Sequence, residues 1–215
     1  MIKLIAAFLM VIDHAGYIFF SENIAFRLIG RVSMPLFAYC IARGYEFSRK
    51  HGTVKKYLKN LVLFSVVAQL PYSKMQSGLN IGVTWLFSLL LLIILGTCDK
   101  KPARDFLACV AVSTAAFCIN IDYGLYGAVM PLVMYYFMIK KYEPFKVMEY
   151  MVILWAFYVL VQNGSLIQIV SCAAIPVLMA AIPIDNRIRL PKWFFYMFYP
   201  AHIAVLLLVH TIVKI

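Results

Sequence analysis

Long apolar runs, separated by short polar or charged stretches, constrain this chain more than any other feature. A helix that crosses a bilayer needs about 17–25 apolar residues, and nine runs of the sequence approach that length. They cover residues 2–20, 24–42, 57–72, 79–97, 103–121, 124–139, 147–161, 165–183 and 193–213. Because 64% of the residues are apolar and 13% are charged, a soluble fold has too little polar sequence to cover these runs. We therefore predict an all-α, polytopic transmembrane helical bundle of about nine spans, which forms one domain over residues 1–215.

The basic residues fall on alternate sides of these runs. Sixteen of the 20 Lys and Arg residues share one side when the N-terminus is placed on that side: Lys3, Arg43, Arg49, Lys50, Lys55, Lys56, Lys59, Lys100, Lys101, Arg104, Lys140, Lys141, Lys146, Arg187, Arg189 and Lys192. The opposite side has Lys74 and Lys214. Cytoplasmic segments of membrane proteins are enriched in basic residues, so we predict the N-terminus inside and the C-terminus outside. This distribution also explains the net charge of +11 without nucleic acid as a partner.

Few ionisable side chains lie inside the runs, and in hydrocarbon such residues are costly and mark functional sites. They are Asp13, His14, Arg27, Arg31, Asp122 and His202. The two arginines are four residues apart, which places them on one face of a helix, and they need counter-ions such as Asp13 or Asp122. Two interpretations stay open. Either the charges form a structural ion-pair network, or the arginines hold an anionic group or orient Asp13 and His14.

His14 is the candidate general base, because an imidazole can accept a proton near neutral pH. Consecutive helix residues diverge by about 100°, so Asp13 cannot readily orient His14, and Asp122 is better suited to that role. A hydrogen-bonded contact between helices is the alternative for His14. A structural role is the alternative for His202, which follows Pro200. We predict Asp13, His14 and Asp122 as catalytic residues.

Further motifs contribute candidate substrate-binding residues. The segment 122–127 reads as a turn between two spans, and its glycines permit a close approach of backbone. An aromatic run near the C-terminus contains Tyr199, and Gln69 closes the third span; helix packing is the alternative for both. The predicted substrate-binding residues are Arg27, Arg31, Gln69, Tyr123, Tyr126, Tyr199 and His202.

Several enzyme classes and sites are not indicated by the sequence. It has no P-loop, no GxGxxG after a strand, no HExxH and no GxSxG, which argues against an ATPase, a metalloprotease and a serine hydrolase. The five cysteines show neither a CxxC pair nor metal-ligand spacing. We therefore predict no metal site and interpret the cysteines as small buried hydrophobic residues. The first run has no cleavage site and reads as a retained span.

A set of short motifs occurs in order along nearly the whole chain. They are Ile-Asp-His at the end of 2–14, Arg-Leu-Ile-Gly-Arg at 27–31, Met-Pro-Leu-Phe-Ala at 34–38, Ala-Gln-Leu-Pro at 68–71, Asp-Tyr-Gly-Leu-Tyr-Gly at 122–127, and Phe-Tyr-Met-Phe-Tyr-Pro-Ala-His at 195–202. Together they resemble the TraX family of bacterial inner-membrane proteins. In this resemblance, His14 with Asp13 corresponds to the motif histidine. The motif polar residues correspond to Arg27, Arg31, Asp122 and His202.

The resemblance implies a function. TraX proteins are associated with N-terminal acetylation of pilin in conjugative systems, and similar proteins accompany acetylated peptide products. We therefore expect an acetyl-CoA-dependent N-acetyltransferase of the bacterial cytoplasmic (inner) membrane. It would move acetyl from cytoplasmic acetyl-CoA to the amine of pilin or another small membrane peptide at the outer face. The basic segment 43–59 is a candidate site for the CoA phosphates, with simple positive-inside anchoring as the alternative.

Two other functions stay open. A proton- or solute-coupled transporter would use intramembrane Asp, His and Arg side chains as a relay or substrate site, although the sequence shows no clear internal repeat of the kind found in transporters. A non-catalytic assembly factor would only dock pilin or another small membrane peptide. Only the enzyme consumes acetyl-CoA, so an acetyl-transfer assay on the purified protein separates the three.

Overall fold

The computed structural model describes residues 1–96, 102–187 and 192–213, and the elements within these ranges are helical apart from one isolated bridge between Leu79 and Ile121. Predicted loop or terminal residues that lie outside the described ranges are Cys98, Lys100, Lys101, Arg189 and Lys214. The α-helices are α1 Ile2–Phe19, α2 Ile24–Gly30, α3 Ser33–Lys50, α4 Val54–Met75, α5 Ile81–Gly96, α6 Pro102–Cys118, α7 Gly124–Val133, α8 Pro144–Gln162, α9 Ala174–Ala181 and α10 Lys192–Val213. A π-helix, η1 Met134–Lys140, and two 3-10 helices, η2 Leu166–Ala173 and η3 Ile182–Arg187, complete the described elements.

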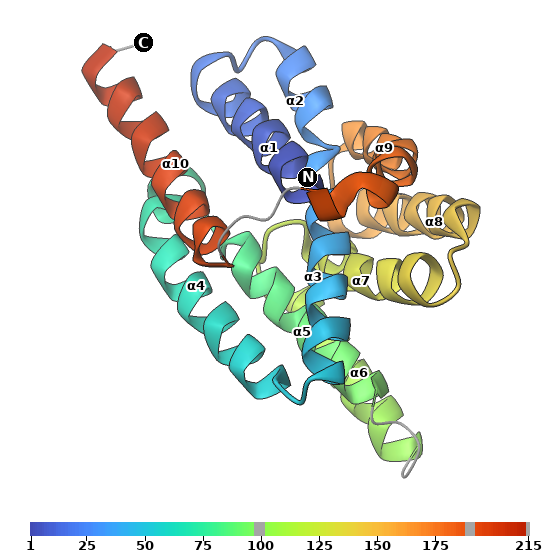
Figure 1. The fold of residues 1–215 in the computed structure, drawn as a ribbon. Helices are drawn as coiled ribbons and strands as arrows, with labels where there is room; N and C mark the ends of the chain where they lie inside the picture. Colours follow the sequence, from blue (N-terminus) through green and yellow to red (C-terminus); the bar gives the residue numbers. More distant parts are fainter. Residues whose placement is uncertain (97–101, 188–191, 214–215) are drawn as a thin grey trace.

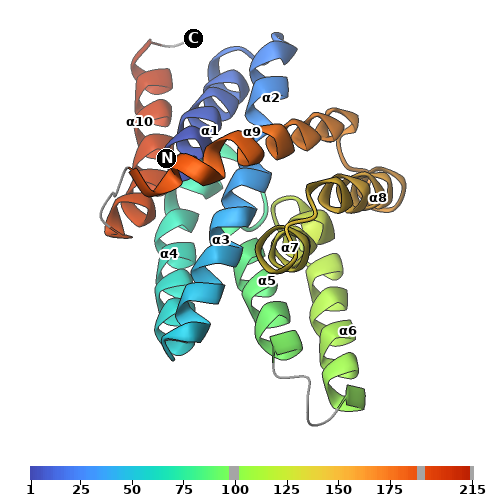
Figure 2. The ribbon, with the colours of Figure 1, turned by 45° about the vertical axis from the view of Figure 1, so that its right-hand side comes forward.

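The helices do not form a simple parallel bundle. Figures 1 and 2 show α3, α4, α5 and α6 running in broadly the same direction, with α1, α2 and α10 at one end of this group. In contrast, α7 and α8 lie across these helices, and the chain of η2, α9 and η3 crosses in front of α3 in Figure 2. Helices that cross so steeply cannot all stand perpendicular to one bilayer plane.

The membrane character of the chain agrees with the prediction, whereas the number of spans is not settled by the helices. In the part of the chain that the structure describes, five helical stretches are long and apolar enough to cross a membrane. They are Ile2–Phe19, Ile24–Lys50, Pro144–Gln162, Leu166–Asp185 and Trp193–Val213. Two shorter apolar helices cover Ile81–Gly96 and Gly124–Lys140. The count of nine spans and the direction of insertion stay predictions.

The predicted second span, 24–42, is interrupted. Helix α2 ends at Gly30, and Arg31 follows as its C-cap, with helical dihedral angles (φ −58°, ψ −24°) and an N–H that donates to the carbonyl of Arg27 at 3.1 Å. The two arginines therefore keep the spacing of one helical turn that the sequence predicts, and the break in the span comes directly after them. A Cβ at Gly30 would collide with the side chain of Asp13 on α1. Glycine therefore permits an approach that any larger residue would block, and this contact brings Asp13 next to Arg27 and to the turn that holds Arg31.

Helix α3 is the centre of the packing. It contacts α1, α4, α5, α7, α9, η1 and η2, and Leu36, Ala38 and Ala42 have no exposed surface. Small residues allow helices to approach closely where no aqueous phase drives their association. Large apolar side chains are exposed on the outer surfaces of α4, α6 and α10, including Leu63, Val66, Leu70, Phe106, Leu107, Val205, Leu208 and Ile212. A surface of this kind is expected where lipid is the solvent.

Cysteine labelling tests the predicted orientation. In a variant whose five native cysteines are replaced by alanine, Asn163→Cys should react with an impermeant thiol reagent in intact cells, because this exposed position is predicted outside. Lys55→Cys, also at an exposed position, should react only after permeabilisation, because it belongs to a basic segment predicted inside. Labelling of Lys55→Cys alone in intact cells would reverse the orientation.

Candidate functional site

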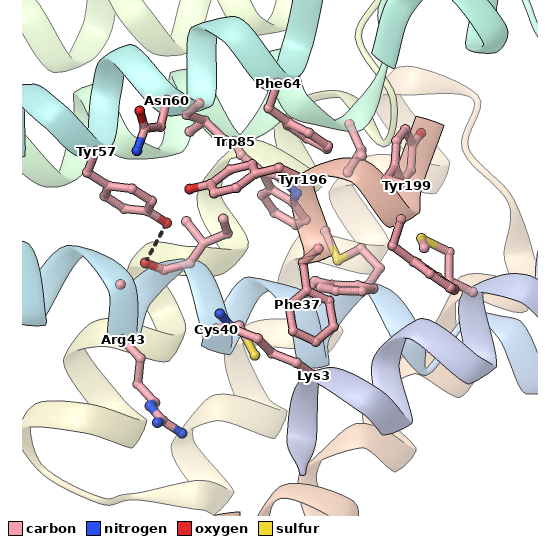
Figure 3. A pocket seen from close by; sticks show the side chains of 18 of the residues that line it. Lys3, Phe37, Cys40, Arg43, Tyr57, Asn60, Phe64, Trp85, Tyr196 and Tyr199 are labelled. Carbon is pink, nitrogen blue, oxygen red and sulfur yellow. Dashed lines mark hydrogen bonds between the residues drawn. The ribbon is translucent and has the colours of Figure 1, made fainter. Parts of the chain in front are cut away.

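A large cavity lies between the helices and has a volume of about 1040 Å³. Its walls come mainly from α1, α3, α4, α5 and α10. Figure 3 shows Arg43 and Tyr57 at one end of this cavity and Tyr199 towards the other, with Phe37 and Trp85 between them. The cavity therefore combines a polar end with an apolar and aromatic middle.

A smaller cavity of about 200 Å³ adjoins the large one. It is lined by Asp13, His14, Tyr17, Arg27, Arg31, Tyr72, Met75, Gln76, Asp122, Tyr123, Tyr158 and Ser165. Four of these residues, Asp13, His14, Asp122 and Tyr123, line the large cavity as well. The two cavities thus share the three residues that the sequence predicts to be catalytic, and we call this shared part the junction.

The two cavities are lined by residues from opposite predicted faces of the protein. Lys3, Arg43 and Lys56, which are predicted on the inner side, line the large cavity. Gln76 and Ser165, which lie in or next to segments predicted outside, line the small cavity. Segments that are distant in sequence but predicted on the same side therefore meet around the same cavity.

His14 is held by another histidine, not by a carboxylate. Its Nδ1 lies 2.7 Å from Nε2 of His202, and the two rings are nearly parallel, with centroids 4.9 Å apart. The Nδ1 of His202 lies 2.9 Å from the carbonyl oxygen of Phe198. The prediction that Asp122 would orient His14 is thus corrected. The reason is the packing of α1 against α10, which brings together residues 188 positions apart.

This arrangement determines which nitrogen of His14 is free. A carbonyl oxygen can only accept, so His202 Nδ1–H donates to Phe198 and leaves His202 Nε2 as an acceptor. His14 Nδ1–H then donates to His202, and His14 Nε2 keeps its lone pair. A histidine in this tautomer can accept a proton at Nε2 from a group in either cavity. His202 itself lines neither cavity, so it orients His14 where a substrate-binding role was predicted.

The two arginines have different partners. The Nη1 of Arg27 is 2.9 Å from the carboxylate of Asp13, so this arginine forms the ion pair that the structural interpretation requires. Among the described residues, no acidic side chain is within ion-pairing distance of Arg31, which is only 8% exposed. Its Nη1 donates to the hydroxyl of Tyr123 at 3.2 Å and to the amide oxygen of Gln168 at 3.4 Å. Its Nε is buried without a hydrogen-bond partner. Arg31 is therefore a buried cation available to an anionic group.

The turn before α7 holds the remaining junction residues. Tyr123 and Gly124 both have positive φ, of 60° and 52°, and a Cβ at Gly124 would meet the side chain of Gln162. The backbone carbonyl of Asp122 accepts a hydrogen bond from Thr84 on α5 at 2.7 Å. This left-handed turn, which glycine favours, lets Asp122 and Tyr123 line both cavities. The turn predicted over 122–127 is shorter than expected, because residues 124–127 already belong to α7.

Two predicted substrate-binding residues lie elsewhere. Gln69 bonds to Asn80 and to the carbonyl of Gly78, so it joins α4 to the start of α5. Tyr126 is fully buried and shares a hydrogen bond of 2.7 Å with Ser171. Neither side chain lines either of the two cavities, and the contacts of both favour the alternative of helix packing.

Three tyrosines of the small cavity are not among the residues predicted from the sequence. Tyr17, Tyr72 and Tyr158 line it together with the charged residues. Tyr17 follows His14 by three residues, a spacing that places both on one face of α1, so it could have been found. For Tyr72 and Tyr158 the sequence carries no such signal, because their positions depend on how α4 and α8 pack.

Within the described ranges, no group of three His, Cys, Asp or Glu side chains is close enough to hold a metal ion. Cys40, Cys118 and Cys172 are present as free thiols. Cys40 lines the large cavity. Cys118 is exposed, so the prediction of uniformly buried cysteines is wrong for this residue, which lies on the outer surface where an apolar thiol can face lipid.

The sequence of this chain is similar to proteins of a known family. The sequence model described as TraX protein matches residues 1–210. The chain belongs to the TraX family. A Dichelobacter nodosus protein named probable fimbrial assembly protein FimC, serogroup H1, is 28% identical over 246 residues, which cover 95% of this chain and 92% of that protein. The uncharacterized protein RP591 of Rickettsia prowazekii is 33% identical over 70 residues, which cover 33% of this chain and 25% of that protein. No solved structure matches this TraX chain.

Replacing His202 tests the tautomer of His14 in this TraX protein. His202→Gln should keep His14 Nδ1 protonated, because the amide oxygen can accept in place of His202 Nε2. His202→Leu should leave a tautomer mixture and cost about 1–3 kcal/mol of stability, since a buried donor then loses its partner. Nitrogen-15 NMR of histidine-labelled protein, with thermal unfolding in detergent, measures both effects. Identical His14 signals in the two variants would contradict the assigned hydrogen-bond chain.

Proposed function

We propose that this TraX protein is a membrane-embedded acetyltransferase of the bacterial cytoplasmic membrane. It transfers acetyl from cytoplasmic acetyl-CoA to an amine, at the N-terminus of pilin or another membrane peptide, near the outer face. The observation that carries this proposal is the meeting of two chemically different cavities at His14. A reaction whose two substrates arrive from opposite sides needs separate approaches to one catalytic group.

The large cavity suits the acyl donor. Its polar end contains residues predicted on the cytoplasmic side, where acetyl-CoA is made, and its apolar middle suits the uncharged arm of the donor. Phe37 and Trp85 line this middle part, and His14 lies at the far end. A thioester that extends along the cavity would therefore present its carbonyl carbon at the junction.

The small cavity suits the acceptor amine. A peptide N-terminus arrives as an ammonium ion, and an ammonium ion is attracted to carboxylates. Among the described residues, no basic side chain forms an ion pair with Asp122, and this residue lines both cavities. Asp122 can therefore hold the ammonium form. This ion releases one proton to water before the neutral amine becomes the nucleophile, so the overall reaction releases one proton.

The transfer step uses the free nitrogen of His14. The amine lone pair attacks the thioester carbonyl and forms the C–N bond, while the amine proton moves to His14 Nε2. The C–S bond then breaks, and the departing thiolate takes that proton back from the imidazolium. The products are an acetylated amine and free CoA, and His14 returns to its starting state. His202 stays neutral throughout and keeps the ring of His14 in place.

Arg31 supplies the positive charge that this step requires. The tetrahedral intermediate carries a negative oxygen, and a donor fixed in advance near that oxygen lowers the barrier without reorganisation. Arg31 lines the small cavity, is buried, and keeps an unpartnered Nε. Arg27 is instead occupied by Asp13, so we assign it the positioning of Asp13 and α1.

A second function is favoured by the comparison. The D. nodosus relative is named a probable fimbrial assembly protein, and a protein that only docks pilin would fit that name without any acetyl transfer. Purified protein in nanodiscs, incubated with radiolabelled acetyl-CoA and a candidate peptide, separates the two functions. Label on the peptide supports the enzyme, whereas peptide binding without label supports the assembly factor.

Removing the proposed base should abolish activity without unfolding the protein. His14→Ala should lower the rate of acetyl transfer by a factor on the order of 10²–10⁴, the usual contribution of a general base. His210→Ala is the matched control, because His210 also lies in a helix but lines neither cavity. Normal turnover of the His14→Ala protein, measured beside the control, would exclude the mechanism.

Lysine substitutions separate the roles of the two arginines. Arg27→Lys should keep most activity, because lysine preserves the charge that pairs with Asp13. Arg31→Lys should keep thermal stability but lower acetyl transfer, on the order of 10²-fold, because lysine lacks the planar fork that holds an oxyanion in place. The measurements are detergent unfolding and acetyl transfer on both variants. Full activity of Arg31→Lys would show that the guanidinium of Arg31 does not stabilise the oxyanion.

A further inference from the structure

The end of the large cavity farthest from the junction has a distinct composition. It is formed by the start of α1, the last turns of α3, the α3–α4 turn and the first turns of α4. The side chains at this end include Arg43, Ser48, His51, Thr53, Lys56 and Asn60, and Lys3 reaches towards it from beside Phe37 and Cys40. We call this group the cavity mouth. Figure 3 shows Arg43, Tyr57 and Asn60 together at this end, away from Tyr199.

The mouth carries more positive than negative charge. Arg43 forms an ion pair with Asp185. Within the part of the chain that the structure describes, no acidic side chain pairs with Lys3 or Lys56; the Lys3 ammonium lies 5.2 Å from the centroid of the Phe195 ring. The lining at this end therefore has three cationic side chains and one carboxylate. By contrast, the small cavity balances two arginines with two aspartates.

The walls beyond the mouth change from charged to apolar. Phe37, Cys40, Phe64 and Trp85 line the cavity between the mouth and the junction. A single ligand that fills both parts needs an anionic head and a long uncharged arm. The hydroxyls of Ser48 and Thr53, which line the same cavity, are further donors of the kind that phosphate oxygens accept.

We propose that the cavity mouth is a phosphate-binding site, in which Lys3 and Lys56 hold the phosphate groups of a ligand whose uncharged arm extends to the junction. Lysine is a common point-charge partner of phosphate, and both lysines are exposed and line the cavity. The assignment of the phosphates to CoA rests on the proposed function. A phospholipid that enters from the membrane has the same chemistry, an anionic phosphate joined to an uncharged chain.

The test compares two lysines on the same helix. Lys56→Glu and Lys59→Glu make the same change of charge on α4, and Lys59 is exposed and lies outside the cavity. In nanodiscs of zwitterionic lipid, Lys56→Glu should weaken the binding of radiolabelled CoA by about tenfold or more, as expected for loss of a charge-assisted contact. Lys59→Glu should bind CoA nearly as tightly as the unmodified protein. Equal effects of the two substitutions, or no effect of either, would overturn the proposal.

Two additions complete the experiment. Lys3→Gln and Lys56→Gln remove the charges without reversing them, and each should weaken CoA binding while the unfolding temperature stays unchanged. Native mass spectrometry of protein from nanodiscs with phosphatidylglycerol distinguishes the sources of phosphate. Retention of this lipid that depends on Lys56, with no binding of CoA, assigns the site to a lipid headgroup. Binding of neither ligand by the unmodified protein overturns the phosphate site.

Failure of this inference differs from failure of the proposed function, because CoA binding and acetyl transfer are measured separately. If Lys56→Glu transfers acetyl with an unchanged KM for acetyl-CoA, the protein is an acetyltransferase but the cavity mouth does not bind the CoA phosphates. If CoA binding depends on Lys56 but no acetyl is transferred to any amine, the phosphate site is supported and the acetyltransferase function is rejected.

Discussion

The contact between α1 and the boundary of α2 and α3 positions Asp13 and His14 at the junction and brings Arg27 next to them. Gly30 has no side chain, so the backbone of this boundary approaches Asp13 more closely than any other residue would permit. Arg27 then reaches the same carboxylate at 2.9 Å. A buried carboxylate that loses its partner costs about 3–5 kcal/mol, so the glycine contact and the ion pair support each other. His14 follows Asp13 on α1 and is held in place by the same contact.

Two clusters of charge show how the protein separates structural from reactive groups. The carboxylate of Glu46 is bonded to Arg49, Lys140 and the hydroxyl of Tyr135, so its oxygens are fully occupied. Arg31, in contrast, has hydrogen bonds only to neutral groups and keeps a buried, unpartnered Nε. An occupied cluster holds helices together. A buried cation without an acidic partner is costly, and a ligand or developing anion can offset that cost.

The apolar runs made the helices predictable, because a segment surrounded by lipid must satisfy its own backbone hydrogen bonds. Most of each run is helical where it is described, and the start of α1 agrees closely with prediction. The predicted turn at 122–127 is confined to Asp122 and Tyr123, because residues 124–127 form the first turn of α7. The interruption at Gly30 and the steep crossing of α7 and α8 were not predicted, because both depend on side-chain contacts between helices. The hydrophobicity of a segment predicts that it is a helix in an apolar environment, but it does not predict the angle at which that helix crosses its neighbours.

For the site, the sequence alone determined which residues are costly to bury, and those residues include Asp13, His14 and Asp122 at the junction. Only the tertiary structure decided their partners. It paired His14 with His202, which lies on α10, and gave Arg27 an acidic partner but not Arg31. Residue type fixes the cost of placing a charge in a membrane. Distances between helices, which the local sequence does not contain, decide whether that cost is offset by a partner or left for a ligand.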